Sequence, residues 1–271
     1  MDSTPFNRAA RPWEAVLSLL VFCLIAGFLL FVTIPVASLF LRITPEAFFW
    51  SLQQPVVLDA LRLSLLTASA STAIVVLLGT PLSYVNARVR YRGRAIVDTL
   101  TDLPIVLPPA VAGIALLMAF GRRGVVGEFL DGFGITVAFT TVAVILAQVF
   151  VASPFYIRQA RASFEAVDPL YEDAARTLGA SRLAVLLRVS IPLARSGLVS
   201  GAILSFARAL GEFGATIMFA GNLQGRTQTM PLAIYTTMQG NLDEAISIAI
   251  VLVVISFAVI LTVKHTTRRS A

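Results

Sequence analysis

Six long apolar segments constrain this chain more than any other feature. A helix that rises 1.5 Å per residue needs about 20 residues to cross a hydrocarbon core about 30 Å thick. In lipid the backbone N–H and C=O groups must bond within the segment, which favours helices, and the ten-residue alternation of a porin strand is missing. The sequence predicts an all-α polytopic protein with a single transmembrane domain over residues 1–271. Its expected spans are residues 13–41, 58–84, 96–120, 135–156, 192–220 and 245–263.

The composition supports a membrane protein and leaves the chain little chemistry. Charged residues make up only 13% of the sequence, about half the share in a soluble domain. There is one cysteine (Cys23), one histidine (His265) and one lysine (Lys264), too few for a Cys/His metal site or an internal disulfide. The Gly-Lys-Ser/Thr signature of a phosphate-binding loop is also missing. We therefore expect no catalytic residue, no metal and no cofactor in this chain, and no enzymatic activity of its own.

The arginines predict which ends of the segments face the cytoplasm. They gather before the first segment, after the second, after the fourth and after the sixth. The alternate connections carry only Arg42, Arg122, Arg123 and Arg226. Short loops rich in Arg and Lys face the cytoplasm, so both termini are predicted to be cytoplasmic in a multi-pass plasma-membrane protein. The arginines of residues 88–94 are interpreted as part of this topology signal.

The connection at residues 157–191 is too strongly patterned to be a plain loop. Asp168 can cap a helix, and Pro169 suits the first helical position. Gly179 suits a helix end, and Ser181 can cap a second helix. The sequence therefore predicts a short cytoplasmic helix between the fourth and fifth spans.

One face of this short helix is apolar and small. Leu170, Ala174 and Leu178 recur at i, i+4 and i+8, which gives a narrow apolar stripe. Ala174, Ala175 and Gly179 are small enough for another protein to approach the backbone. The pattern favours docking to a partner over the alternative, an interfacial helix that lies on the membrane. The acids in its first turn argue against binding to anionic lipid.

The same region carries a resemblance to a known family. The residues are Glu172-Asp173-Ala174-Ala175, then Gly179, then nine residues to Val189-Ser190-Ile191-Pro192. This resembles the Glu-Ala-Ala loop of ABC-importer permeases, with Asp173 where Glu is usual. In that family the loop forms a coupling helix that sits in a groove of the ATP-binding subunit. The resemblance implies the fold of a type I ABC importer permease, and it implies that the ATPase is contacted by Glu172, Asp173, Ala174, Ala175 and Gly179.

Two ionisable residues lie deep in the fifth segment. Arg208 and Glu212 are spaced i, i+4, share a predicted helix face and can pair. Arg208 is about 16 residues past Pro192, or roughly 24 Å along the helix. A charge at such depth costs at least ~2.5 kcal/mol on insertion scales and usually faces a polar interior. The pair is interpreted either as part of the translocation pathway or as an ion pair that only fixes helix packing.

The third segment is rich in proline. Pro104, Pro108 and Pro109 interrupt helical hydrogen bonding and predict a kink. The surrounding run resembles the third-span motif of oxyanion permeases, which bends a helix that faces the pore. These prolines are therefore candidates for the pathway, and a kink that serves packing alone is the alternative. Asp98 and Asp102 are expected in the first turns, where the helix dipole favours acids.

Small residues recur in the fifth segment. Gly197 and Gly201 form a small-xxx-small pair, and Gly211 and Gly214 follow. Such residues let helices pack closely in lipid, so we interpret them as packing positions.

The resemblance covers nearly the whole chain after the first segment. Residues 209–222 look like the fifth span of molybdate and sulfate permeases, and residues 225–235 are closer to the molybdate branch. The resemblance implies ATP-driven import of a tetrahedral oxyanion by alternating access, with molybdate first and tungstate or sulfate as alternatives. It also implies four partners and no nucleic acid. They are two ATP-binding subunits that hold ATP and Mg²⁺, a second permease copy, and an external oxyanion-binding protein at a bacterial or archaeal plasma membrane.

An ion-coupled secondary transporter that works without an ATPase is the competing hypothesis. It would need broken helices and buried acids in matching repeats. Among the acids only Glu212 lies deep within a segment, and no paired halves are visible in the sequence. Transport by the chain alone, driven by an ion gradient without ATP, would favour this alternative.

Overall fold

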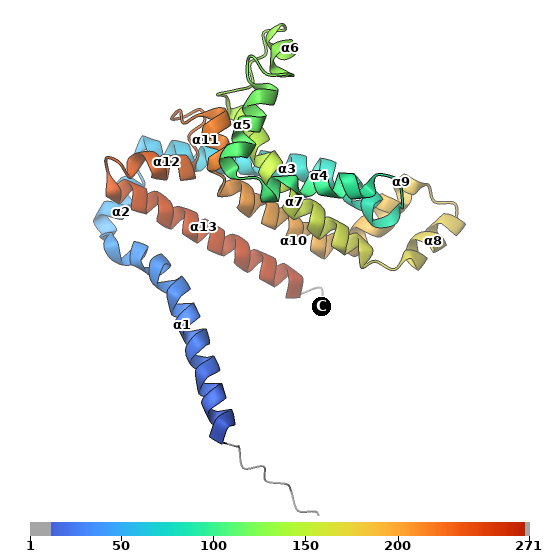
Figure 1. Cartoon of the computed structure of the whole chain (residues 1–271), viewed down its shortest axis with the longest axis horizontal. Helices are drawn as coiled ribbons and strands as arrows, with labels where there is room; N and C mark the ends of the chain where they lie inside the picture. The colour runs from blue at the N-terminus through green and yellow to red at the C-terminus, as the bar shows by residue number, and fades with distance from the viewer. Residues whose placement is uncertain (1–11, 269–271) are drawn as a thin grey trace, which may run out of the picture. The chain divides into compact units, whose positions relative to one another are not determined.

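The computed structural model describes residues 12–268, and every regular element in that range is a helix. The chain divides into two compact units, Met1–Pro45 and Glu46–Ala271. The first unit holds α1 (Pro12–Arg42), a 31-residue helix with no buried residue among its described side chains. The helices from α3 onward belong to the second unit, and Figure 1 shows the order of the helices along the chain. That both units form one transmembrane domain stays a prediction.

The predicted all-α polytopic class is confirmed. Five helices within the described residues are long and apolar enough to cross a membrane. A sixth crossing results if the bent pair α4 (Arg94–Val106) and α5 (Pro109–Phe120) is counted as one span. The five are Val16–Arg42, Pro55–Arg88, Thr141–Glu165, Arg182–Leu210 and Leu242–Thr262.

Three helices form the centre of the second unit. α3 (Pro55–Arg88), α7 (Thr141–Glu165) and α10 (Ile191–Leu210) pack against one another (Figure 1). α13 (Leu242–Arg268) and α12 (Met230–Thr237) pack together, and they contact α10 and α3 respectively. The apolar side chains between the three central helices are buried, so this contact is the core that positions the loops.

Glycines bring these helices close together. A Cβ on Gly79 of α3 would lie 2.9 Å from the Tyr156 ring, and one on Gly201 of α10 would lie 3.1 Å from Gln159 Cβ. A Cβ on Gly197 would overlap the Ser163 hydroxyl. The packing role predicted for the glycine pair in the fifth segment is therefore confirmed.

The third predicted span is broken, not merely kinked. α4 ends at Val106 and α5 begins at Pro109, and the two helices are bent by 117°. Leu107 and Pro108 adopt extended backbone angles, because a residue before proline avoids the helical region. Pro109 then takes the first position of α5, where its missing N–H costs nothing.

The fifth predicted span is broken as well, at Gly211. α10 ends at Leu210, and α11 (Gly214–Ala220) follows and packs on α5. Here a Cβ on Gly113 would lie 2.5 Å from Met218 Cβ and 2.8 Å from the Ala215 carbonyl oxygen. The second halves of the two broken spans therefore brace each other through backbone contact.

The remaining boundaries depend on local capping. The fourth predicted span corresponds to α7, which begins at Thr141 instead of residue 135. It begins there because the Thr140 hydroxyl accepts a hydrogen bond from the Ala143 N–H. Phe139, just before this cap, has a φ of 60°, which is incompatible with a continuing helix. α7 then runs past residue 156 to Glu165. Two short helices, α2 (Pro45–Ser51) and α6 (Gly127–Asp131), lie in the connections.

The α5–α11 contact yields a stability prediction. Gly113→Ala adds a Cβ where backbone stands in the way, so we expect overpacking to cost ~1–3 kcal/mol and to lower the melting temperature in detergent. Gly240→Ala is the matched control, because nothing lies within 4 Å of its added Cβ. Equal melting temperatures for the two variants would contradict this account of the brace.

Candidate functional site

The predicted short helix is present as α8 (Pro169–Thr177). Its start is as expected, since Asp168 Oδ1 accepts a hydrogen bond from the Leu170 N–H at 2.9 Å and Pro169 is the first residue. This cap satisfies one of the N–H groups that a helix leaves unpaired at its beginning. The predicted N-terminal cap is therefore confirmed.

The turn that ends α8 contains Gly179, at a position that suits glycine better than any other residue type. Gly179 has a φ of +87°. Its N–H donates to the Arg176 carbonyl at 2.9 Å, and the Ala180 N–H donates to the Ala175 carbonyl at 3.0 Å. Together these bonds form a Schellman motif, which requires the left-handed backbone that glycine adopts freely. Ser181 then caps α9 (Arg182–Val185), as predicted.

The apolar stripe of α8 faces away from the rest of the chain. Leu170 is 71% exposed and Leu178 is 88% exposed, and Ala174 between them is also exposed. Tyr171 and the nearby Leu183 add further exposed apolar area. Large exposed apolar patches on helices commonly mark interaction sites. Asp173 and Gly179 are exposed and Ala175 is half-exposed beside this stripe.

Glu172 is the exception, because the structure buries it. Sequence reasoning placed Glu172 with Asp173 among the partner contacts, but its side chain is only 3% exposed. The carboxylate accepts hydrogen bonds from Arg88 Nε at 2.9 Å, Ser190 Oγ at 2.9 Å and Tyr84 OH at 3.0 Å. Successive residues of a helix point in different directions, so Asp173 faces outward while Glu172 attaches α8 to the core.

The pKa of Glu172 reflects two opposing effects. Burial is the largest single effect and would raise the pKa of this carboxyl group. The hydrogen bonds from Ser190, Arg88 and Tyr84, with the positive charge of Arg88, outweigh burial and hold the pKa below its ordinary value. Glu172 is therefore ionised at neutral pH.

Arg88 holds a second group besides Glu172. Its Nη2 donates to the Val167 carbonyl oxygen at 2.7 Å, in the link between α7 and α8. The sequence predicts only a topology signal for the arginines of residues 88–94, whereas Arg88 also bonds to Glu172 and to the Val167 carbonyl. Nothing in the local sequence distinguishes Arg88 from the exposed Arg90, since only the fold brings α3 beside α8.

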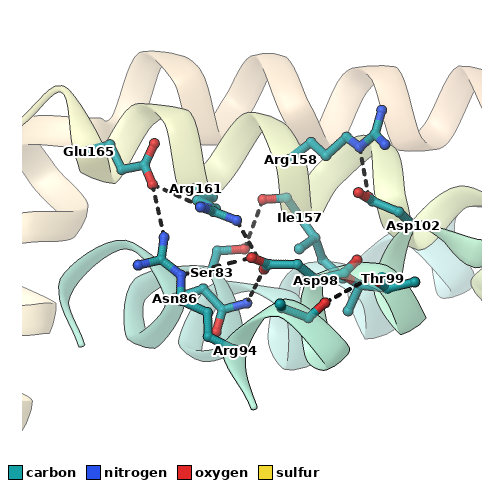
Figure 2. Close-up of polar contacts among 12 residues, drawn as sticks. Ser83, Asn86, Arg94, Asp98, Thr99, Asp102, Ile157, Arg158, Arg161 and Glu165 are labelled. Carbon is teal, nitrogen blue, oxygen red and sulfur yellow. Dashed lines mark hydrogen bonds and ion pairs between the residues drawn. The ribbon is translucent and has the colours of Figure 1, made fainter. Parts of the chain in front are cut away.

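A second polar cluster joins α4 to α7. Figure 2 shows Asp98 facing Arg161 and Asn86, at 2.9 Å from Arg161 Nη1 and 3.0 Å from Asn86 Nδ2. Arg161 also reaches Glu165 at 2.9 Å, and Arg94 lies 3.5 Å from the same carboxylate. The cluster ties the first half of the broken third span to the helix that leads into α8.

The placement of the acids in this cluster corrects an expectation. Because α4 begins at Arg94, Asp98 and Asp102 lie in its second and third turns, and its first turn has no acid. Each is paired with an arginine of α7, and Asp98 also contacts Asn86 of α3 and Arg94 of α4. Asp102 Oδ1 lies 2.7 Å from Arg158 Nε (Figure 2).

Arg208 and Glu212 pair as predicted, but across a helix break. Arg208 Nη1 lies 2.7 Å from Glu212 Oε2, although α10 already ends at Leu210. The other Glu212 oxygen accepts a hydrogen bond from the Ala215 N–H at 2.8 Å and so caps α11. Glu212 is buried and Arg208 is half-buried. The pair therefore has a structural function at the break, and its place in a pathway stays a prediction.

The lowered pKa of Glu172 gives a pH prediction. A depressed folded pKa stabilises the attachment of α8 above the ordinary value of about 4.3, and this contribution is lost as the pH falls through the folded pKa. Amide hydrogen exchange of α8, corrected for intrinsic rates, should be constant from pH 8 to 5 and accelerate only in stronger acid. Loss of protection between pH 7 and 5 would contradict an ionised, hydrogen-bonded Glu172.

Comparison with known proteins places the chain in a family. Residues 75–266 match the family described as "Binding-protein-dependent transport system inner membrane component". The chain is 45% identical over 239 residues to the "Molybdenum transport system permease protein ModB" of Mycobacterium tuberculosis, which covers 88% of this chain and 90% of the relative. It is 41% identical over 203 residues to the protein of the same name in Escherichia coli K12, which covers 74% of this chain and 89% of the relative.

A solved structure supports the same assignment at the level of the fold. The chain resembles a chain of the "bacterial alginate ABC transporter in complex with alginate pentasaccharide-bound periplasmic protein", with a TM-score of 0.73 and 17% identity. The match covers 94% of this chain and 95% of that one. The chain therefore belongs to the family of binding-protein-dependent transport system inner membrane components, and it is a multi-pass permease subunit of an ABC importer, a transport component and not an enzyme.

Proposed function

We propose that this chain carries molybdate across the plasma membrane as the permease of an ATP-driven importer. The identity to relatives named as molybdenum transport permeases supports this substrate, since it extends over most of both chains. The observation that carries the coupling mechanism is α8, which exposes an apolar face and has a fixed attachment on the opposite side. Tungstate and sulfate share the tetrahedral dianion shape and are the alternative cargoes.

We place α8 in the cytoplasm as the helix that docks to the ATP-binding subunit. The docking surface consists of the stripe Leu170–Ala174–Leu178 with Asp173, Ala175 and Gly179 at its edges. Its apolar centre would bury against the partner, and its single exposed carboxylate gives orientation. The burial of Glu172 supports leaving this residue out of the surface. Both termini would then lie in the cytoplasm, as the arginine distribution predicts.

The complete transporter would contain two copies of this chain and two ATP-binding subunits. The ATPases would hold ATP and Mg²⁺, and an external binding protein would deliver the oxyanion. The solved relative in complex with a periplasmic protein supports the last partner. We propose a homodimer of the permease, as the resemblance to the molybdate branch implies.

Transport would follow alternating access. ATP closes the ATPases, α8 moves with them, and the broken spans change their packing so that the site opens outward. The breaks at Pro108–Pro109 and at Gly211 are suited to this motion, because helices pivot more readily where hydrogen bonding is interrupted. Pro104, Arg208 and Glu212 flank these breaks and remain our candidates for the pathway.

Reconstitution tests the function directly. Proteoliposomes that contain this chain, its ATP-binding subunit and its binding protein should accumulate molybdate only when ATP is supplied. Added tungstate and sulfate should compete with molybdate uptake in the order of their affinities for the transporter. Uptake by the chain alone under an ion gradient would instead support the secondary transporter, and preference for sulfate would overturn the proposed cargo.

The docking surface is tested by one charged substitution. Leu178→Asp places a charge within the apolar stripe that would be buried against the partner, so affinity for the ATPase should fall at least about tenfold, or about 1.4 kcal/mol. Val125→Asp is the matched control, because Val125 is 89% exposed and Leu178 is 88% exposed. Titration of the solubilised permease with the ATPase measures both variants. Unchanged affinity of Leu178→Asp would refute docking through this stripe.

A further inference from the structure

Side chains from α3, 84 and 88 residues earlier in the chain, and from a helical turn 18 residues later meet at the Glu172 carboxylate. Tyr84 and Arg88 come from the end of α3, and Ser190 comes from η1 (Leu186–Ser190), a π-helical turn that runs directly into α10. The Arg88–Glu172 pair is largely buried, with side chains 12% and 3% exposed. One carboxylate therefore joins α8 to two of the three central helices.

Arg88 restricts rotation of α8 about the short connection between α7 and α8. Its Nε holds Glu172 within α8, and its Nη2 holds the Val167 carbonyl oxygen just before α8. A tilt of α8 relative to α3 would have to break at least one of these charge-assisted bonds. Removal of one partner of a buried ion pair is strongly unfavourable, so tilting within the chain is resisted.

The π-helical turn extends this attachment to α10. Ser190 is fully buried, and its hydroxyl donates to Glu172 Oε1 at 2.9 Å. π-helical turns occur mostly as single turns inside α-helices, often at functional positions. Here the turn directs the Ser190 hydroxyl toward α8. α10 continues from it to the helix break, where Arg208 and Glu212 pair.

We propose that Arg88 and Glu172 are positioning residues that make α8, the end of α3 and the start of α10 move as one body. When the partner moves the exposed face of α8, the ends of α3 and α10 then move with it, because α8 does not bend relative to them. This inference rests on the proposed function, because it assigns the transmission of the same docking event. Consecutive residues divide the work, with Asp173 facing the partner and Glu172 facing the core.

The first test measures coupling. Arg88→Gln in the reconstituted transporter should lower ATP-driven molybdate uptake at least tenfold, while ATP hydrolysis and co-purification of the ATPase stay within twofold. Arg90→Gln is the matched control, since Arg90 is exposed and no ion pair involves it within the described part of the chain. Equal uptake by both variants would overturn the proposal, and failure of wild-type uptake would instead overturn the proposed function.

The second test measures the motion itself. Spin labels at Thr177 and Val89, in a Cys23→Ser background, report the distance between α8 and the end of α3. This distance should stay constant between the nucleotide-free and ATP-bound wild-type transporter, and its distribution should broaden in Arg88→Gln. A change of distance in the wild type would overturn the proposal.

A milder variant keeps the test valid if Arg88→Gln fails to accumulate. Tyr84→Phe removes one hydroxyl donor and leaves the Arg88 and Ser190 contacts of Glu172 in place. The amount of molybdate imported per ATP should fall about two- to threefold, with normal assembly. Loss of assembly in proportion to uptake would show that the cluster serves folding alone, and would overturn the positioning role.

Discussion

The attachment of α8 through the buried Arg88–Glu172 pair is the contact on which the rest of this structure depends. α8 has little apolar surface turned toward its own chain, since its leucines face outward. Its position is therefore set by polar bonds to Arg88, Tyr84 and Ser190. Such bonds are directional, so they fix an orientation more narrowly than apolar contact does.

The membrane-spanning helices of the second unit combine a tightly packed core with two breaks in helical hydrogen bonding. Glycines at the α3–α7 and α7–α10 contacts bring the backbones close, which makes the core stiff. The breaks before Pro109 and after Leu210 come where α5 and α11 brace each other. A permease needs both properties, because force must pass through the core without loss while some element changes its packing.

Sequence reasoning predicted the helical class, the bounds of α8 and the pairing of Arg208 with Glu212, because each follows from local rules of periodicity, capping and spacing. It failed where the outcome depended on contacts between distant segments. Glu172 and Asp173 are chemically alike, and only the approach of α3 buries one and exposes the other. The α7 arginines that pair with Asp98 and Asp102 likewise lie more than fifty residues along the chain.

The two polar clusters differ in their exposure to dissolved ions. Arg158 and Asp102 are 59% and 36% exposed at their side chains, whereas the Arg88–Glu172 pair is screened from solvent by the core. At physiological ionic strength the Debye length is about 8 Å, so mobile ions weaken exposed pairs far more than buried ones. Rising salt should therefore weaken the exposed Arg158–Asp102 pair between α7 and α4 more than the buried Arg88–Glu172 pair between α3 and α8. One of the two attachments is sensitive to dissolved electrolyte, and the other is shielded from it.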